Sequence, residues 1–302
     1  MRLAAAMAGQ LSSVLLGADH SVMGAVLAVL SGTHLLIEDV PGVGKTLLAK
    51  ALAASVGGSF ARVQGHPDLL PSDITGVSIY NPEGRSWELV KGPVFANVVL
   101  VDELNRTPPR TQAALLEAMA EHQVTIDGSA HRLPAPNIVV ATQNPLSELG
   151  TFPLVESQLD RFGISTTIGY PQIEIEVDLA TDHGGERQLA TVEAKMDVRE
   201  WAEAQEAVKS VRVAGGVARY AVTICRETRS QVGVMLGASP RAVITLVRVA
   251  QANAVMAGRD YVVPDDVKSV AQAVLKHRIM TEGITGRDVV RNALVAASAP
   301  RP

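Results

Sequence analysis

A glycine-rich turn in the first third of the chain has the residue types that bind the phosphates of a nucleotide. It reads VPGVGKTL over residues 40–47. The glycines allow successive backbone N–H groups to converge on phosphate oxygens, while Lys45 can reach the β and γ oxygens and Thr46 offers a hydroxyl to Mg²⁺. The sequence therefore predicts a nucleotide-binding loop formed by Pro41, Gly42, Val43, Gly44, Lys45, Thr46 and Leu47.

Asp39 stands where the strict phosphate-loop pattern has its first glycine. Aspartate is one of the few residues that tolerate left-handed backbone angles, so we expect the turn to form in spite of this departure. Its carboxylate would then stand near a bound triphosphate. The alternative interpretation is a glycine turn that arose by chance, but the turn has strand-like and helix-like segments on its two sides, which favours nucleotide binding.

Two adjacent carboxylates, Asp102 and Glu103, follow a short apolar run at residues 97–101. Beside a phosphate loop, Asp102 would hold Mg²⁺, usually through water, and Glu103 would polarise the water that attacks the γ-phosphate. The alternative is an acidic strand end that only caps the next helix. The chain has no Asn-Lys-x-Asp signature for guanine, so ATP is the expected nucleotide.

The pattern of apolar residues predicts an α/β fold around these groups. Short apolar runs at residues 34–37, 97–101 and 137–141 are typical of buried strands, and residues 47–53 favour a helix. Strands that alternate with helices indicate a parallel sheet. Segments 77–90 and 124–133 each have turn residues at their centre and are predicted to form hairpins inserted into this core.

The second part of the chain has helical periodicity at residues 201–211, 217–229, 240–256 and 264–280. We therefore predict two domains, an α/β nucleotide-binding core over residues 1–190 and an all-helical domain over residues 191–302. Residues 1–200 hold 13 Lys and Arg against 23 Asp and Glu, while residues 201–302 hold 14 against 8. The two regions thus have opposite net charge, which either serves an interface or is a solvated bias without a role.

Composition narrows the classes of function. The chain has 302 residues, a formal net charge of -4 and 3% aromatic residues, so nucleic acid is not an expected partner. A single cysteine, Cys225, fits a reducing compartment, and we expect a cytoplasmic protein. The uncharged stretch at residues 20–37 is interrupted by SGTH, which argues against a membrane helix.

With these features the chain resembles the AAA+ ATPases, and within them the MoxR family. The runs that carry this resemblance are DLLPSDITG (residues 68–76), GPVFAN (92–97), DELNR (102–106), ATQNP (141–145), QLDRF (158–162) and GASPR (237–241). The resemblance implies a parallel-sheet core with two hairpin inserts and a helical lid. It also implies that the inserts face a pore or a partner, with Trp87 as a contact residue.

The resemblance also implies roles for three residues outside the loop. Asn144 would be the sensor that helps to hold the attacking water, Arg241 the lid residue that touches the phosphates, and Arg161 the arginine finger supplied to a neighbouring subunit. The simpler alternatives are a strand-end cap for Asn144 and an ion pair with Asp160 for Arg161.

The expected function is therefore that of an ATPase with ATP and Mg²⁺ as cofactors, assembled as a homo-oligomeric ring of six subunits. By resemblance, hydrolysis would drive the chaperone-like remodelling or maturation of client proteins, with von Willebrand A domain proteins as candidates. Two other functions stay open at this point: an ATP-driven nucleic-acid motor, which only the basic second domain supports, and a nucleotide-dependent scaffold with little turnover.

Overall fold

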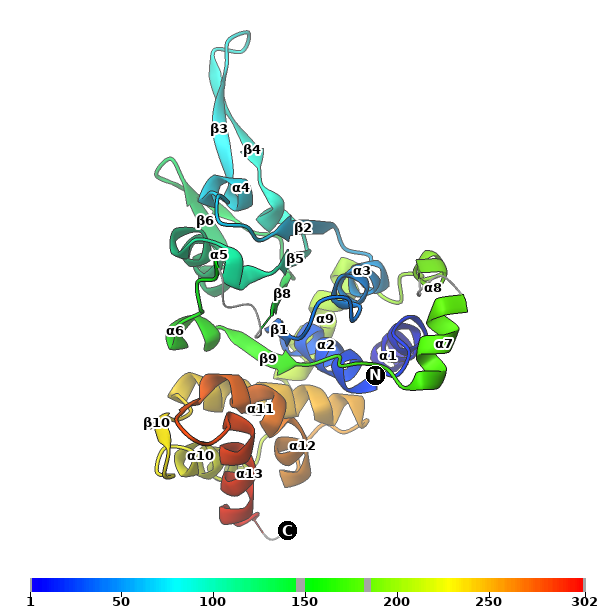
Figure 1. The fold of residues 1–302 in the computed structure, drawn as a ribbon, viewed down its shortest axis with the longest axis vertical. Helices are drawn as coiled ribbons and strands as arrows, with labels where there is room; N and C mark the ends of the chain where they lie inside the picture. The colour runs from blue at the N-terminus through cyan, green and yellow to red at the C-terminus, as the bar shows by residue number, and fades with distance from the viewer. Residues whose placement is uncertain (1, 145–149, 182–185, 301–302) are drawn as a thin grey trace.

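A parallel five-stranded sheet lies at the centre of the computed structural model, which describes residues 2–144, 150–181 and 186–300 (Figure 1). The strand order is β2-β5-β8-β1-β9. The strands are β1 (His34–Glu38), β2 (Phe60–Gln64), β5 (Val98–Asp102), β8 (Ile138–Gln143) and β9 (Phe162–Thr166). The three predicted strands are confirmed as β1, β5 and β8, the continuously apolar strands at the centre of the sheet.

Helices cover both faces of this sheet, and the alternation of side chains along each strand supplies both cores. Leu35 and Ile37 of β1 belong to one buried cluster, and Leu36 belongs to the other. The first cluster packs against α1 (Arg2–Val14), α2 (Asp19–Ser31) and α3 (Lys45–Ser55). The second packs against α4 (Pro71–Thr75) and α5 (Pro109–Glu121).

Both predicted hairpins are present, and they project from the end of the molecule opposite the C-terminus (Figure 1). The first is formed by β3 (Gly76–Asn81) and β4 (Ser86–Lys91), the second by β6 (Gln123–Ile126) and β7 (Ser129–Arg132). The second hairpin turns at Asp127 and Gly128, whose φ angles are 49° and 79°. Left-handed angles at both central residues are typical of a two-residue hairpin turn.

Short elements connect the core to the helical region. They are η1 (Pro93–Phe95), η2 (Leu104–Arg106), α6 (Glu156–Leu159), α7 (Ile173–Thr181) and α8 (Glu186–Ala190). The α8 helix contacts α1 and α3 near the phosphate loop, and α6 contacts the helical region that follows.

The remaining chain is helical, as predicted, with one small antiparallel ribbon. Its elements are α9 (Val198–Lys209), α10 (Gly215–Glu227), β10 (Val234–Leu236), α11 (Pro240–Met256), α12 (Pro264–Leu275), η3 (Lys276–Arg278), β11 (Met280–Thr281) and α13 (Gly286–Ala296). The helix expected over 264–280 ends earlier, at Leu275. The reason is local, because the tighter turn η3 directs Arg278 toward the carbonyl oxygens at the start of β9.

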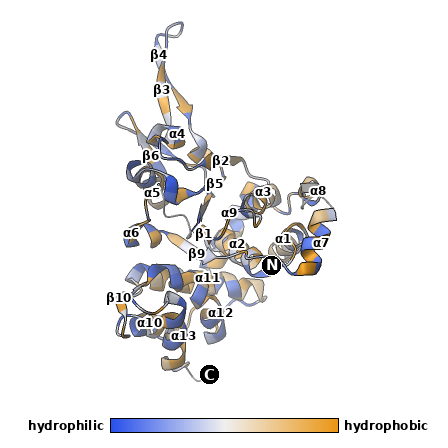
Figure 2. Cartoon of the chain, in the orientation of Figure 1, coloured by the Kyte–Doolittle hydropathy of each residue, from blue (hydrophilic) through white to orange (hydrophobic). Residues whose placement is uncertain are grey.

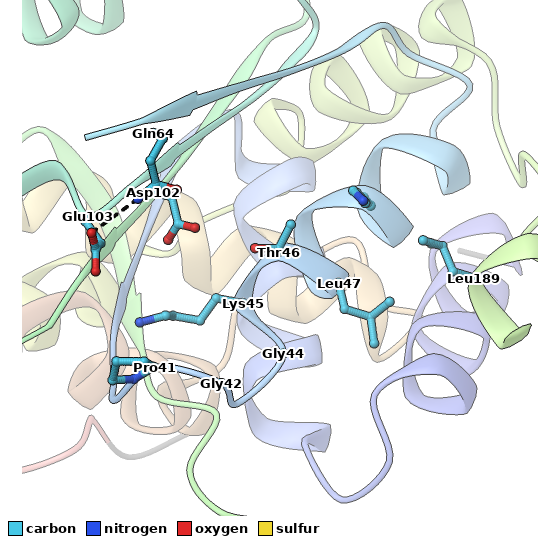
Figure 3. Close-up of a pocket in the computed structure, with 11 residues that line it drawn as sticks. Pro41, Gly42, Gly44, Lys45, Thr46, Leu47, Gln64, Asp102, Glu103 and Leu189 are labelled. Carbon is cyan, nitrogen blue, oxygen red and sulfur yellow. Dashed lines mark hydrogen bonds between the residues drawn. The ribbon is translucent and has the colours of Figure 1, made fainter. Parts of the chain in front are cut away.

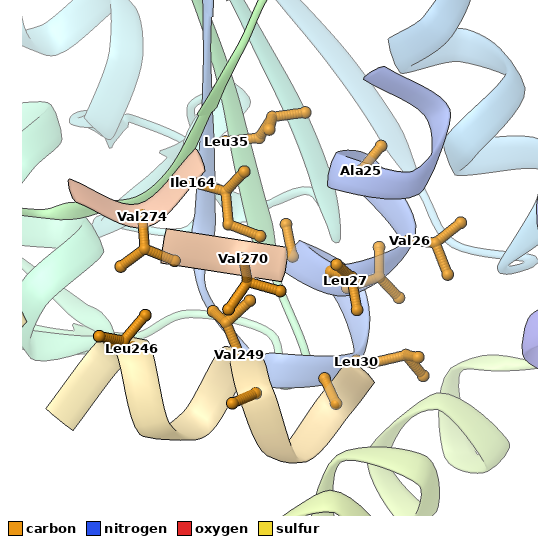
Figure 4. Close-up of a cluster of buried hydrophobic side chains, with 14 of the residues drawn as sticks. Ala25, Val26, Leu27, Leu30, Leu35, Ile164, Leu246, Val249, Val270 and Val274 are labelled. Atoms are coloured by element: carbon orange, nitrogen blue, oxygen red, sulfur yellow. The ribbon is translucent and has the colours of Figure 1, made fainter. Parts of the chain in front are cut away.

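The helical region packs tightly on the sheet through apolar side chains. Leu246 and Val249 of α11, with Val270 and Val274 of α12, lie against Ile164 of β9 and the end of α2 (Figure 4). These helices carry hydrophilic as well as hydrophobic residues (Figure 2), which is the amphipathic pattern of helices that cover a core. Because apolar packing is continuous here, the domain boundary near residue 190 stays a prediction.

The described residues include no helix that is both long enough and apolar enough to cross a membrane.

Candidate nucleotide site

The phosphate loop connects β1 to α3 and adopts a shape that only glycine reaches without strain. Gly42 and Gly44 have φ angles of 86° and 97°, and a Cβ added at either would meet nothing within 4 Å. The α3 helix begins at Lys45, so its first N–H groups and the positive end of its dipole lie at the loop. A helix start of this kind is a ready-made site for anions.

A cavity of about 470 Å³ opens beside this loop (Figure 3). The residues that line it are Pro41, Gly42, Gly44, Lys45, Thr46, Leu47, Lys50, Gln64, Asp102, Glu103 and Leu189. The fold thus brings the predicted loop and both predicted carboxylates together. They meet because the carboxyl ends of parallel strands β1 and β5 share one edge of the sheet.

A second cavity of about 280 Å³ adjoins the first and is more apolar. The two cavities share Gly42, Gly44 and Leu47, and the second is also lined by Val43. Its other walls come from the turn between α1 and α2, from Ile168, Gly169 and Pro171, and from α7. A polar phosphate site beside an apolar slot matches the two parts of a nucleotide, its phosphates and its base.

The turn forms in spite of Asp39, as expected, and Asp39 does not need a left-handed backbone angle to form it. Its buried carboxylate instead accepts hydrogen bonds from three backbone N–H groups. Oδ1 accepts from Val40 at 2.8 Å, and Oδ2 accepts from Ile168 and Gly169 at 2.6 and 2.7 Å. The carboxylate therefore ties the loop to the segment after β9.

Asp102 is held in place by two neighbouring strands. Its Oδ1 accepts a hydrogen bond from the Thr142 hydroxyl of β8 at 2.7 Å, and its Oδ2 pairs with the Arg62 guanidinium of β2 at 2.9 Å. The same Thr142 oxygen accepts from the backbone N–H of Glu103 at 2.9 Å. Thr142 thus fixes both acidic residues relative to the sheet.

The Glu103 side chain is held in place by two donors. Its Oε2 pairs with the Arg106 guanidinium at 3.1 Å and accepts from Gln64 Nε2 at 3.2 Å (Figure 3). Glu103 itself has a left-handed φ of 55°, which orients it at the tight turn between β5 and η2. The site therefore holds a carboxylate that can accept a proton. Arg106 and Gln64 restrain the position of this carboxylate.

The donor set fits a magnesium nucleotide. The Thr46 hydroxyl and the Asp102 carboxylate line the same cavity, and hard oxygen ligands of this kind suit Mg²⁺, which keeps several waters and phosphate oxygens in its shell. Both Asp102 oxygens already accept hydrogen bonds, which fits contact through water better than direct ligation.

Asn144 directly follows β8, the strand between β5 and β1, and so lies at the same edge of the sheet. Its backbone oxygen accepts a hydrogen bond from Asn105 Nδ2 at 3.3 Å. Its role as a sensor of the attacking water stays a prediction. Pro145, which completes the ATQNP run, lies outside the described residues.

Arg161 and Arg241 are absent from the walls of the phosphate-loop cavity. Together they line a separate opening of about 210 Å³, and Asp160 lines it as well. Arg161 Nη1 donates to the carbonyl oxygen of Leu116 at 3.1 Å, and the ion pair of Asp160 is formed with Arg278. The alternative of an Arg161–Asp160 pair is therefore not what the structure shows.

Sequence reasoning missed the residues that hold the two carboxylates. Arg62 and Gln64 belong to β2, a half-exposed edge strand that the apolar pattern did not reveal. Thr142 was part of a recognised run, but the run gave no sign of its contacts. The position of Gln64 at the carboxyl end of a strand that pairs with β5 is visible only in the fold, so the sequence offers no signal for it.

Comparisons with known proteins agree with this geometry. The family model described as "ATPase family associated with various cellular activities (AAA)" matches residues 34–164, and the AAA lid domain model matches residues 226–293. The uncharacterised protein YeaC of Bacillus subtilis is 43% identical over 96% of this chain and 92% of its own length. The chaperone MoxR1 of Mycobacterium tuberculosis is 36% identical over 97% of this chain and 81% of its own.

A solved structure is also similar over nearly the whole chain. The crystal structure of a proposed ATPase from Cytophaga hutchinsonii superposes with a TM-score of 0.90 at 34% identity, covering 99% of this chain and 96% of that one. The phosphate loop, the paired carboxylates, the helical lid and these relatives lead to one conclusion: the chain belongs to the MoxR family of AAA+ ATPases.

Proposed function

We propose that this chain binds Mg-ATP in the phosphate-loop cavity and hydrolyses it to ADP and phosphate. The observation that carries the proposal is the meeting of Lys45, Thr46, Asp102 and Glu103 in a single cavity. The adjoining apolar slot supports a bound base at one end of the site.

Each of these residues has a separate task in the proposed reaction. Lys45 and the N–H groups at the start of α3 bind the phosphates, and Thr46 and Asp102 hold Mg²⁺. The metal ion would supply charge neutralisation at the phosphate oxygens. Glu103 accepts the proton of the attacking water, after moving away from Arg106 and Gln64, which contact it in this structure.

The site is completed by a second subunit. Arg161 and Arg241 lie together at a different opening of the same chain, which supports a role for both at the nucleotide of a neighbouring subunit. Negative charge on the transferred phosphoryl group spreads over several oxygens, and guanidinium groups stabilise it well. A head-to-tail assembly that closes on itself forms a ring, and we infer six subunits.

ATP hydrolysis by the ring drives the remodelling or maturation of client proteins in the cytoplasm. The relative named chaperone MoxR1 supports this class of function, and von Willebrand A domain proteins are the candidate clients. The first hairpin offers a contact surface, because Trp87 near its turn is 72% exposed. The Trp87 ring packs edge-on against the Tyr80 ring, with the ring centroids 5.5 Å apart. Exposed aromatic side chains are favoured in protein contacts.

The direct test is phosphate release by the purified full-length chain, by Glu103→Gln and by Glu282→Gln. Glu282 is exposed and lies in the lid, so its variant is a matched control. We expect the parent and the control to turn over at the same rate and Glu103→Gln to lose turnover. Equal rates for the parent and Glu103→Gln would contradict the proposal. Proteins that co-purify with Glu103→Gln in the presence of ATP would then identify the clients.

A further inference from the structure

One carboxylate connects the two segments that carry Arg161 and Arg241. Asp160 directly precedes Arg161 at the end of α6 and is 18% exposed. Its two oxygens accept from the Ser239 hydroxyl at 3.1 and 3.0 Å. Ser239 lies two residues before Arg241 and caps α11, since its hydroxyl also accepts from the backbone N–H of Ala242 at 3.0 Å. The core and the lid therefore meet at Asp160.

Arg278 strengthens this connection through an ion pair with Asp160. Its Nε donates to Asp160 Oδ1 at 3.0 Å, and its side chain is only 2% exposed. The same guanidinium donates to the carbonyl oxygens of Phe162 and Gly163 at 2.7 and 3.3 Å. Burial lowers the pKa of Arg278 to about 10 while Asp160 raises it, so the group stays charged at neutral pH. A buried charge of this kind depends on its partner.

The fold also holds the Arg161 side chain and the helix that carries Arg241. Arg161 Nη1 donates to the Leu116 carbonyl oxygen near the end of α5. Arg241 lies in the first turn of α11, a helix that packs on β9 and α2 through Leu246 and Val249 (Figure 4). Asp160 itself lines the opening that both arginines share. Asp160 thus lies between the segments that carry the two arginines.

We propose that Asp160 is a positioning residue that sets Arg241 of the lid in register with Arg161 of the core, so that both guanidinium groups meet a neighbouring subunit's nucleotide as one unit. This inference rests on the proposed function, in which both arginines act across the interface. A misplacement of about 1 Å in a group that stabilises the transition state costs on the order of a hundredfold in rate. Asp160 therefore controls catalysis in the next subunit without touching ATP.

The test is a set of mixing experiments with Asp160→Asn, which keeps the size of the side chain and removes its charge. Alone, this variant should bind ATP like the parent, because its own phosphate loop is intact, and should hydrolyse it about 10 to 100 times more slowly. Asp260→Asn is the control, because Asp260 also pairs with an arginine, Arg212, but is 79% exposed. We expect its rate to equal that of the parent.

Mixing identifies the side of the interface at which Asp160 acts. Asp160→Asn mixed with Lys45→Ala should recover activity, since a mixed ring pairs an intact loop with an intact arginine face. Asp160→Asn mixed with Arg161→Ala should recover none, because both variants lack the same face. A loss of folding in Asp160→Asn would not be rescued selectively in this way. Ser239→Ala, which keeps the Asp160–Arg278 pair, should show the same selectivity with a smaller loss of rate and serves if Asp160→Asn does not fold.

Three results would overturn the inference: a parental rate for both Asp160→Asn and Ser239→Ala, recovery with Arg161→Ala, or no recovery with Lys45→Ala. The pair of Lys45→Ala with Arg161→Ala separates this failure from that of the proposed function. If that pair recovers while the Asp160 pair does not, only the role of Asp160 is wrong. If neither pair recovers despite subunit exchange, the proposed arrangement across the interface is wrong, and the role of Asp160 with it.

Discussion

The Lys45 ammonium donates a hydrogen bond to the main-chain carbonyl oxygen of Asp39, 2.8 Å away. The lysine expected to bind phosphates thus lies over its own loop, while the Asp39 carboxylate ties the start of that loop to Ile168 and Gly169. Asp39, the residue that departs from the phosphate-loop pattern, is therefore one of the groups that hold the loop in its shape.

Removing the Asp39 carboxylate should loosen this loop. Asp39→Ala leaves three backbone N–H groups without their acceptor, and we expect it to lower the free energy of unfolding by about 3 kcal/mol and to weaken ATP binding. Asp39→Asn keeps one acceptor oxygen and should lose less. Urea unfolding and ATP titration of both variants measure this. Parental stability and affinity in Asp39→Ala would show that the carboxylate does not support the loop.

Lys45→Ala and Glu103→Gln should separate binding from hydrolysis. Lys45 meets the phosphates in the ground state, whereas Glu103 acts when water attacks, so only the first variant should lose tight binding. Equilibrium binding of labelled ATP to both, together with phosphate release, checks this. Glu103→Gln with a parental turnover would remove Glu103 from its assigned role.

Burial of His34 makes stability depend on pH. Its Nδ1 accepts from the Val139 N–H at 3.0 Å, so Nε2 carries the proton and donates to the Met119 carbonyl oxygen at 3.2 Å. Burial lowers the pKa of His34 from 6.5 to about 4; the hydrogen bond to Met119 partly opposes this, and His122 adds to it. The unfolded chain therefore takes up a proton between pH 6.5 and pH 4 that the folded chain does not.

It follows that stability falls as the pH falls below 6.5. Between pH 7 and pH 5, His34 should contribute a loss of on the order of 2 kcal/mol in the free energy of unfolding. Urea unfolding of the parent and of His34→Gln at both pH values checks the sign, and the variant should depend less on pH. An equal pH dependence in both proteins would mean that His34 does not titrate in this way.

The opposite charges of the two regions suit a head-to-tail ring, in which the basic lid of one subunit lies against the acidic core of the next. Screening lengths fall from about 10 Å at 0.1 M salt to about 3 Å at 1 M, so assembly should weaken as salt rises. Sedimentation velocity with saturating Mg-ATP at each salt concentration measures this. A ring population that stays constant or grows would mean that apolar contacts dominate the interface.

The predicted features share a physical basis. Strands β1, β5 and β8 each hold three or four consecutive apolar residues because helices cover both of their faces, so a single run of sequence reveals them. Strand β2 lies at an edge and is half-exposed, and β9 ends in Ser165 and Thr166, so neither has that signature. The contacts of Asp39 could not be predicted, because Ile168 and Gly169 lie 129 and 130 residues further along the chain.

The most direct test of the account is the activity of mixed Lys45→Ala and Arg161→Ala subunits. Each variant should be inactive alone, the first for want of phosphate binding and the second for want of the arginine supplied to a neighbour. In a mixed ring, some interfaces join an intact loop to an intact Arg161, so phosphate release should recover and pass through a maximum as the ratio changes. No recovery at any ratio, with subunit exchange demonstrated, would contradict the account and place Arg161 in its own subunit's site or outside catalysis.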